Sequence, residues 1–424
     1  MSITPKKNIL YAQSGGPTAV INASACGVIE AAKTSGQFGT VYAAKNGILG
    51  ALKEELIDTF LEPAENIAAL KYTPASAFGS CRFKLKSLEQ NDREYRRLID
   101  VFKAHDIHYF FYNGGGDSQD TSDKVSQISA KLGYPITCIG IPKTIDNDLP
   151  FTDNCPGFGS VAKYVAVSTK EAALDVKSMS TSSTKVFILE VMGRHAGWIA
   201  AAGGLAQTEK EIDGSHIILF PEIAFDQKSF LEKVDHAVKT AGYCVVVASE
   251  GIRNADGKFI QDSGLSDAFG HAQLGGIAPL LANLIKTNLG YKYHWGVSDY
   301  LQRAARHIAS ETDVNQAYLL GKTAVDYALA GKNNIMLTIK RKSNSPYQWS
   351  IGEAKLSDVA NIESKMPRDF ISTDGYSITS KCREYLNPLI QGESYPPYEN
   401  GMPKYVILKN KLIEKKLSEE FELC

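Results

Sequence analysis

The sequence lacks the features that would place it in several common protein classes. Its seven cysteines are scattered and none forms a CxxC pair, so neither zinc binding nor thioredoxin-type chemistry is indicated. An odd number of cysteines in a long chain suits reduced thiols in a cytosolic protein. The N-terminal residues do not form a secretory leader, and the longest apolar stretch, residues 198–205, is broken by glycine and too short to span a bilayer. We therefore expect a cytoplasmic protein with no membrane partner.

An excess of charge of one sign is also missing. The chain has 46 Lys plus Arg and 47 Asp plus Glu, which gives a formal net charge of -1. No global positive field would attract nucleic acid, so no nucleic-acid partner is expected. An anionic ligand must be held by a few basic residues placed locally. The 424 residues are enough for two or three domains, and no repeat or low-complexity tract is visible.

The chain does contain several short apolar runs that end in a glycine or proline turn and lead into a helical pattern. Because these runs are continuously apolar, they are typical of parallel strands covered on both faces. In such sheets the loops at the carboxyl ends of strands collect in one crevice and bind ligands there. From about residue 331 onward the pattern fades, and we expect an irregular tail packed against the body. The apolar runs are residues 9–12, 109–112, 137–141, 185–191 and 244–249.

The first turn after such a run, Ser14-Gly15-Gly16, has the composition of a phosphate-binding loop. Glycines let backbone N–H groups approach an anion closely, and the N-terminus of the following helix adds a favourable dipole. The same residues would also suit a plain tight turn. This motif alone leaves both possibilities open.

The second turn, residues 114–118, repeats the design and adds the carboxylate of Asp117. Turn sterics alone do not explain three consecutive glycines before a carboxylate. Asp117 could hold the Mg²⁺ that phosphoryl transfer uses to neutralise charge on the phosphate oxygens. It could instead cap the following helix, although Asp120 or Thr121 could also do this.

The third turn, residues 142–148, is the most informative. At this spacing Asp146 and Asp148 repel each other, and the resulting loss of stability indicates that the two carboxylates have a function. A carboxylate in an electropositive cleft can accept a proton from a sugar hydroxyl as that oxygen attacks phosphorus. Lys143 can neutralise charge on the transferring phosphoryl group. An Asx-rich turn would explain the composition but neither Lys143 nor Thr144.

At these residues the sequence resembles the phosphofructokinase family, and the similarity extends over most of the chain. In that family the first aspartate of a Thr-Ile-Asp-Asn-Asp motif is the general base on the 1-hydroxyl of the sugar. The resemblance implies this role for Asp146. It also implies that Thr144 and Ile145 contact the substrate and that Asp148 lies near the metal.

Two positions bear on the phosphoryl donor. Members that use ATP have glycine before the threonine, whereas members that use pyrophosphate have lysine, here Lys143. Pyrophosphate users also carry aspartate before the serine of the glycine loop, here Asp117, whose side chain would fill the space of a nucleotide α-phosphate. Gly116 departs from the family pattern, which has a magnesium-linked aspartate there. Either Asp117 takes over metal binding or the alignment is ambiguous by one residue. The resemblance implies pyrophosphate as donor and Mg²⁺ as cofactor, with Gly15, Arg82, Gly116, Asp117 and Lys143 at the donor.

Further segments resemble the sugar-phosphate site of the family. Two of them compete for the 6-phosphate: residues 271–276, which have leucine where the family has arginine, and the Tyr-Leu-Gln-Arg motif at residues 300–303. We favour the second. His195 is expected to be structural, and Lys185 resembles a basic residue that family members lend to a neighbouring subunit. The resemblance implies the substrate ligands Met192, Gly193, Arg194, Glu250, Tyr300, Leu301, Gln302, Arg303 and Lys185.

The implied architecture is an α/β fold of two three-layer α/β/α (Rossmann-like) domains with the active site in the cleft between them. Residues 1–150, completed by 300–424, would bind the donor, and residues 151–299 would bind fructose 6-phosphate. The implied reaction is reversible phosphoryl transfer from pyrophosphate to the 1-hydroxyl of fructose 6-phosphate. Asp146 would accept the proton, and Lys143 and Arg194 would stabilise the developing charge. A homodimer or homotetramer is expected.

Three other interpretations remain open. An ATP-dependent phosphofructokinase would need an adenosine site, against which Asp117 and Lys143 both argue. A more distant NAD kinase would not require the Met-Gly-Arg and Tyr-Leu-Gln-Arg motifs. A catalytically inactive regulatory subunit that binds sugar phosphate would not need Lys143, Asp146 and Arg194 together.

Overall fold

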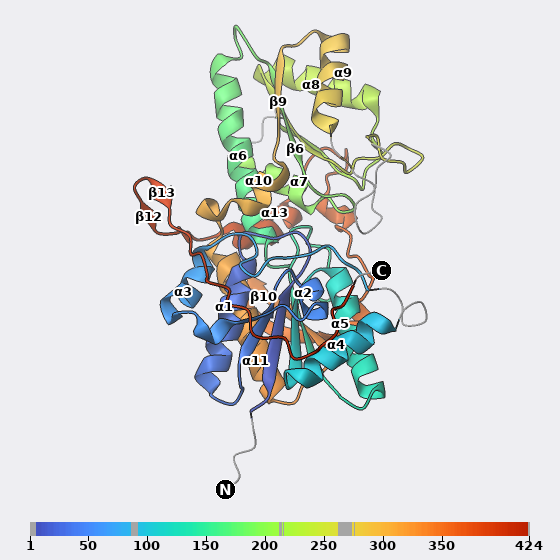
Figure 1. Cartoon of the computed structure of the whole chain (residues 1–424). Helices are drawn as coiled ribbons and strands as arrows, with labels where there is room; N and C mark the ends of the chain where they lie inside the picture. The colour runs from blue at the N-terminus through green and yellow to red at the C-terminus, as the bar shows by residue number, and fades with distance from the viewer. Residues whose placement is uncertain are drawn as a thin grey trace.

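The computed structural model describes residues 6–85, 92–211, 214, 216–261, 274 and 276–422. Eleven of its strands form two large sheets with helices on both faces of each, one body above the other in Figure 1, and β12 and β13 form a separate two-stranded hairpin. The strands are β1 (Asn8–Gln13), β2 (Val41–Ala44), β3 (Leu56–Asp58), β4 (Ile107–Gly114), β5 (Thr137–Pro142), β6 (Val186–Val191), β7 (His216–Leu219), β8 (Cys244–Ser249), β9 (Tyr293–Val297), β10 (Ile335–Asn344), β11 (Tyr347–Lys355), β12 (Tyr398–Glu399) and β13 (Met402–Pro403). The helices are α1 (Ile21–Ser35), α2 (Ile48–Leu52), α3 (Ala64–Ala69), α4 (Arg93–Ala104), α5 (Gly116–Lys131), α6 (Phe158–Met179), α7 (Trp198–Ala202), α8 (Gln227–Ala241), α9 (Ile277–Leu289), α10 (Asp299–Ala304), α11 (Glu311–Leu329), α12 (Leu356–Val359) and α13 (Ser380–Leu386).

The larger sheet has the strand order β11-β10-β5-β4-β1-β2-β3. Strands β2, β1, β4, β5 and β10 pair in parallel, whereas β3 and β11 run antiparallel at the two edges. One buried apolar cluster joins this sheet to α1 and α11, and a second joins its other face to α2, α4 and α5. The sheet is therefore the middle of three layers. Since β1, β4 and β5 are parallel neighbours, the loops that follow them lie side by side.

The smaller sheet is fully parallel, in the order β7-β8-β6-β9. Helices α6 and α7 and the tail segment around α13 pack on one face, and α8 and α9 pack on the other. The loops after the adjacent strands β6 and β8 emerge together. Long helix α6 connects the two bodies in Figure 1.

The tail contradicts one prediction from the sequence. An irregular chain was expected from about residue 331, but β10 and β11 form a hairpin that extends the larger sheet. The apolar start of β10 was missed because the strand continues into partly exposed, polar and basic residues that pair only with β11. The tail does pack against the body, as expected: Ile413 N donates a hydrogen bond of 2.9 Å to Leu56 O on β3.

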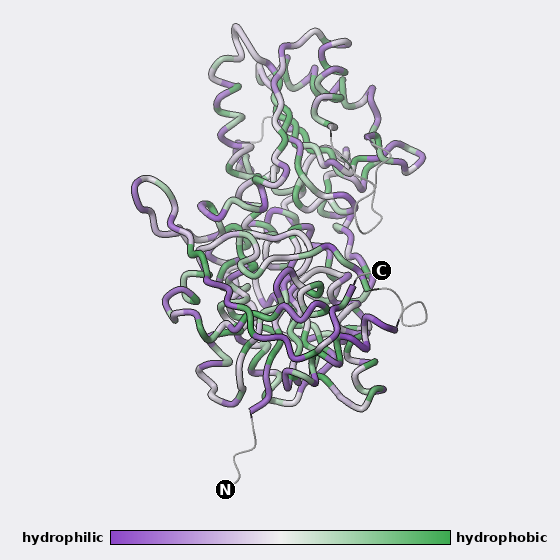
Figure 2. Tube along the Cα trace, in the orientation of Figure 1, coloured by the Kyte–Doolittle hydropathy of each residue, from purple (hydrophilic) through white to green (hydrophobic). Residues whose placement is uncertain are grey.

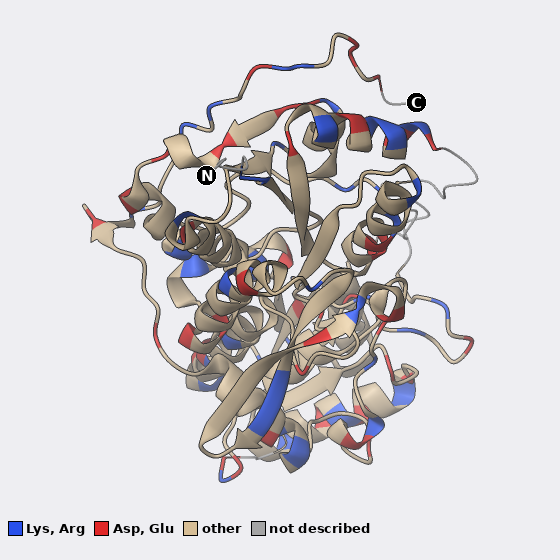
Figure 3. Cartoon of the chain, turned by 90° about the horizontal axis from the view of Figure 1, so that it is seen from below, with Lys and Arg blue, Asp and Glu red and all other residues tan. Residues whose placement is uncertain are grey.

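The distribution of side chains agrees with this layered arrangement. Hydrophobic residues follow the strands inside both bodies in Figure 2. Acidic and basic residues are interspersed over the molecule in Figure 3, without a large region of one sign. Within the described residues, no helix has both the length and the apolar character needed to cross a membrane.

Helices α1 and α11 cross closely because each has a glycine at the contact. A β-carbon on Gly321 would lie 2.0 Å from Ser24 O, and one on Gly27 would lie 2.2 Å from Tyr318 O. Both neighbours are backbone atoms, which cannot rotate away. The helices would have to separate to accept a methyl group at either position.

We predict that Gly321→Ala lowers the free energy of unfolding by roughly 1–3 kcal/mol, because overpacking outweighs the better helix propensity of alanine. The measurement is the urea unfolding midpoint. Gly296→Ala is the matched control, since its added methyl would meet only a Phe187 ring carbon at 3.6 Å. Equal midpoints for the two variants would contradict the close crossing.

Candidate active site

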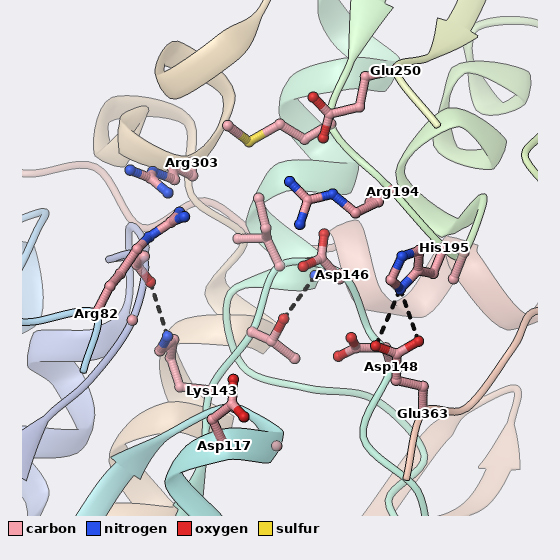
Figure 4. A pocket seen from close by; sticks show the side chains of 18 of the residues that line it. Arg82, Asp117, Lys143, Asp146, Asp148, Arg194, His195, Glu250, Arg303 and Glu363 are labelled. Atoms are coloured by element: carbon pink, nitrogen blue, oxygen red, sulfur yellow. Dashed lines mark hydrogen bonds and ion pairs between the residues drawn. The ribbon is translucent and has the colours of Figure 1, made fainter. Parts of the chain in front are cut away.

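A cavity of about 1030 Å³ lies where the loops of both sheets meet. The loops after β1, β4 and β5 line one side of it, and the loops after β6 and β8 line the other. Figure 4 shows basic side chains on one side of this cavity and several carboxylates toward its middle and far side. The three polar turns found in the sequence are thus brought to one place.

Three cations converge on the turn after β1. Lys143 Nζ donates a hydrogen bond of 2.9 Å to Gly16 O. A β-carbon on Gly15 would lie 3.2 Å from Lys143 Nζ, and one on Gly16 would lie 2.4 Å from Arg303 Nη1 and 4.0 Å from Arg82 Nη2. A side chain on the turn would have to displace these cations, and the left-handed backbone of Gly15 (φ +72°) also favours glycine. The arrangement suits an anion bound between the turn and the cations.

Lys143 is only 4% exposed. Burial lowers the pKa of its ammonium group to about 8, with a further contribution from Arg303, while Asp146 and Asp148 oppose the shift. A nearby anion would stabilise the protonated, charged form of this group and so offset the effect of burial. A bound phosphate group would provide one.

Helix α5 begins at Gly116, so Asp117 lies in its first turn at the cavity. Its carboxylate forms an ion pair of 2.7 Å with Lys84 Nζ. A β-carbon on Gly116 would meet nothing within 4 Å, so this position borders open space. Asp117 is therefore the residue through which the first turn of α5 presents a carboxylate to the cavity.

Asp146 lies in the loop after β5, with its backbone N–H bonded to Thr144 Oγ1 at 3.0 Å. Burial raises the pKa of its carboxyl group, and the nearby Lys143 and Arg194 oppose the rise. In Figure 4 it lies near the Arg194 guanidinium group, between the basic and the acidic sides of the cavity. A carboxylate with a raised pKa is a better proton acceptor than an ordinary surface aspartate.

Two further carboxyl groups of the cavity have raised pKa values. Burial, with the charges of Asp146 and Glu363, raises the pKa of Asp148 to about 7. Burial, with the charge of Asp146, also raises the pKa of Glu250 to about 7. The charge of Asp146 contributes to both shifts, and this concentration of carboxyl groups favours a ligand with hydroxyl donors or a metal ion.

The loops of the smaller sheet supply the opposite side. Arg194 lines the cavity, and its Nε is buried without a hydrogen-bond partner among the described residues. Glu250 lies within reach of the Gly193 backbone N–H at 3.4 Å. The Glu190 carboxylate accepts hydrogen bonds from Gly276 N at 3.1 Å and Ala278 N at 2.8 Å, which anchors the start of α9.

Most of the residues proposed from the sequence line this cavity. They are Gly15, Arg82, Gly116, Asp117, Lys143, Thr144, Ile145, Asp146, Asp148, Met192, Arg194, Glu250, Tyr300 and Arg303.

Four proposed substrate ligands do not line the cavity. Gln302 is 1% exposed, and its Oε1 lies 3.4 Å from the Met192 backbone N–H, so it supports the loop after β6. Leu301 is 66% exposed and lies outside the cavity lining. Gly193 is buried, and Lys185 precedes β6, at the end of the strand opposite to Arg194, where its ammonium group bonds Ser180 O. Of the competing segment 271–276, residues 271–273 and 275 lie outside the described residues.

The structure adds residues that the sequence motifs did not indicate. Lys84, Asn361 and Glu363 line the cavity, and His195 Nδ1 lies 2.9 Å from Glu363 Oε2. Lys84 could have been predicted from the sequence, because it lies two residues after Arg82, which was expected at the donor. Asn361 and Glu363 carried no signal, because they belong to the tail and reach the cavity only through the fold.

The carboxylates of Asp148 and Asp117 are the proposed metal ligands. Within the described part of the chain, no group of three or more His, Cys, Asp or Glu is arranged to hold a metal ion. Mg²⁺ usually keeps several waters and binds through one or two carboxylates together with substrate phosphates. The residues therefore fit a magnesium ion that arrives with a phosphate ligand, with Asp148 offering a carboxylate that forms no ion pair within the described residues.

Comparisons with known proteins agree with this geometry. A family model described as phosphofructokinase matches residues 8–328. A protein of Methylococcus capsulatus named pyrophosphate–fructose 6-phosphate 1-phosphotransferase is 63% identical over 418 residues, 98% of this chain and 99% of that protein. Crystal structures of pyrophosphate-dependent phosphofructokinases from Nitrosospira multiformis and Marinobacter aquaeolei match with TM-scores of 0.91 and 0.90, at 62% and 63% identity. Each covers 98% of this chain and 100% of its own. The fold class predicted from the sequence is confirmed.

We predict that the affinity for an inorganic phosphate anion, measured with pyrophosphate by calorimetry, falls as the pH rises through about 8. The depressed pKa of Lys143 means that its positive charge is present below pH 8 and lost above it. Once the charge is lost, the apparent dissociation constant should rise by up to about tenfold per pH unit.

Lys143→Arg is the matched variant, because arginine keeps its charge throughout this range. The ionisation of pyrophosphate itself is common to both proteins, so the difference between their profiles isolates Lys143. If pyrophosphate affinity falls equally above pH 8 in the unaltered chain and in Lys143→Arg, Lys143 does not supply the charge.

Proposed function

The chain belongs to the phosphofructokinase family, and we propose that it transfers a phosphoryl group from pyrophosphate to the 1-hydroxyl of fructose 6-phosphate. The products are fructose 1,6-bisphosphate and phosphate. The observation that carries the proposal is that buried Lys143 and Asp117 line the same cavity as Asp146. Lysine and aspartate at these two positions favour a donor without a nucleoside.

The reaction proceeds by in-line displacement at the terminal phosphorus of the donor. Asp146 accepts the proton of the 1-hydroxyl as that oxygen forms its bond to phosphorus. The bond from phosphorus to the bridging oxygen breaks, and phosphate leaves with the electron pair. Lys143 and Arg194 lie on either side of Asp146 in Figure 4 and stabilise the charge on the transferring group.

Asp148 and Asp117 would hold Mg²⁺ that arrives with the donor. The ion would supply charge neutralisation on the phosphate oxygens. Asp117 is already paired with Lys84, so its share in metal binding requires that ion pair to rearrange. The carboxylate of Asp148 is the better ligand on this ground.

The sugar phosphate occupies the side of the cavity formed by the smaller sheet. Glu250 accepts hydrogen bonds from sugar hydroxyls, Met192 covers the sugar, and Tyr300 and Arg303 contact the 6-phosphate. Arg303 packs over the Tyr300 ring at 3.9 Å, which holds the pair as a unit. The position of Arg303 beside Gly16 also places its charge near the donor.

A homo-oligomer would complete this side of the site. Lys185 lies away from the cavity of its own chain and would serve the site of a neighbouring subunit. Strand β9 is an edge strand with Trp295 45% exposed, which suits burial against a second copy. The six described cysteines are free thiols, in keeping with a cytoplasmic location.

The decisive assay measures fructose 1,6-bisphosphate formation with Mg²⁺ and either pyrophosphate or ATP. We expect turnover with pyrophosphate and at least a hundredfold lower kcat/KM with ATP. Turnover with ATP alone would reject the donor while keeping the family. No turnover with either would favour a regulatory subunit.

We predict that Asp146→Asn lowers kcat by roughly 100- to 10,000-fold while fructose 6-phosphate still binds, because the amide cannot accept the proton. The readouts are steady-state turnover and sugar-phosphate binding by calorimetry. Asp256→Asn, in an exposed turn, is the matched control. Near-normal turnover in Asp146→Asn would remove Asp146 as the base.

A further inference from the structure

A short piece of the tail forms part of the cavity wall. This rim segment, residues 361–363, follows α12 and lies exposed at the mouth of the cavity, where all three residues line it. Asn361 has a left-handed backbone (φ +59°) that turns the chain toward α5. None of the phosphate, sugar or metal roles proposed above uses this segment.

Contacts at both ends fix the position of the rim segment. Before it, Leu356 and Val359 of α12 are fully buried against the larger sheet. After it, Ser364 N donates a hydrogen bond of 2.6 Å to Asp148 O. The Glu363 carboxylate lies 2.9 Å from His195 Nδ1, which belongs to the loop after β6. The segment is thus attached to the loops of both sheets.

A chain of polar contacts connects the rim segment to Asp117. Asn361 Nδ2 donates a hydrogen bond of 3.0 Å to Asp120 Oδ1, one turn along α5 from Asp117. Lys84 Nζ lies 3.4 Å from Asn361 Oδ1 and 2.7 Å from Asp117 Oδ1. The side-chain amide of Asn361 therefore accepts a hydrogen bond from Lys84 and donates one to Asp120.

We propose that the rim segment, through Asn361, limits the length of the phosphoryl donor. This inference rests on the proposed function. A donor whose reacting phosphorus lies near Asp146 and which extends along the start of α5 meets Asp117 first and the contacts of Asn361 with Lys84 and Asp120 next. On this proposal, two linked phosphates end before these contacts. A third phosphate, with or without a nucleoside, has to displace them.

The rim acts differently from the carboxylate of Asp117. Asp117 repels a further phosphate by charge, and its pairing with Lys84 weakens that repulsion. Asn361 is neutral, and it excludes a longer donor by occupying space and by its hydrogen bonds with Lys84 and Asp120. Removal of the Asp117 charge alone therefore leaves a barrier to longer donors.

The test uses inorganic pyrophosphate and inorganic tripolyphosphate with Mg²⁺, because they differ in length without a nucleoside. Binding of each to the full chain is measured by calorimetry, and the readout is the ratio of the two dissociation constants. In the unaltered chain we expect tripolyphosphate to bind at least tenfold more weakly, although it carries more negative charge. Equal or tighter binding would overturn the inference without any variant.

Asn361→Gly removes the side chain at a left-handed position that glycine adopts without strain. We expect it to reduce the ratio at least fivefold, and Asp117→Gly together with Asn361→Gly to reduce it at least fivefold beyond Asp117→Gly alone. Asn400→Gly is the matched control, an exposed asparagine at φ +52° in the turn between β12 and β13, and should leave the ratio within twofold.

A ratio that Asn361→Gly leaves within twofold, both alone and in the Asp117→Gly background, would overturn the role of the rim. An effect in either background supports it. The fate of the proposed function is read separately, from turnover of the unaltered chain with pyrophosphate. Absence of that turnover would reject the reaction, while the binding ratio would still decide whether the rim limits the length of the bound anion.

Discussion

The site is organised around one buried ammonium group. Lys143 is almost fully removed from water, and its Nζ donates to Gly16 O. Removing a charged group from water is unfavourable unless partners compensate, and a backbone carbonyl compensates only in part. The nearby carboxylates of Asp146 and Asp148 supply more, and the anionic donor supplies the rest. Gly15 suits this position because its backbone is left-handed (φ +72°) and a β-carbon there would lie only 3.2 Å from Lys143 Nζ.

Basic and acidic side chains are separated within the cavity, with the basic ones around Lys143. Lys143, Arg82 and Arg303 surround the turn after β1. Asp146, Asp148 and Glu250 have raised pKa values because burial disfavours their charges, and the charge of Asp146 adds to the shifts of the other two. The cations at the turn after β1 stabilise a donor rich in negative charge. The carboxyl groups suit an acceptor whose hydroxyl group donates hydrogen bonds and loses a proton. Asp146 lies between these two parts of the cavity.

The sequence predicted the parts of the molecule that depend on local patterns. Five apolar runs became β1, β4, β5, β6 and β8, and the turns that follow them line the cavity. The β10–β11 hairpin was missed because half of β10 is polar, and its place in the sheet depends on pairing with β5, about 200 residues earlier. The contact between Lys84 and Asn361 joins residues 277 positions apart. No spacing rule within a motif could have indicated it.

Donor selection is therefore divided between two kinds of structure. Lys143 and Asp117 are fixed by the larger sheet and by the start of α5, so their positions follow from the core. The rim segment depends on exposed polar contacts, and contacts of this kind contribute about 0–1 kcal/mol each. These contacts alone would not keep Asn361 in place against a charged ligand. The burial of Leu356 and Val359 immediately before the segment supplies the missing stabilisation, since a fully buried aliphatic side chain contributes about 1.5–3 kcal/mol. Packing of the short helix α12 thus determines whether a polar rim with weak contacts can exclude a longer donor.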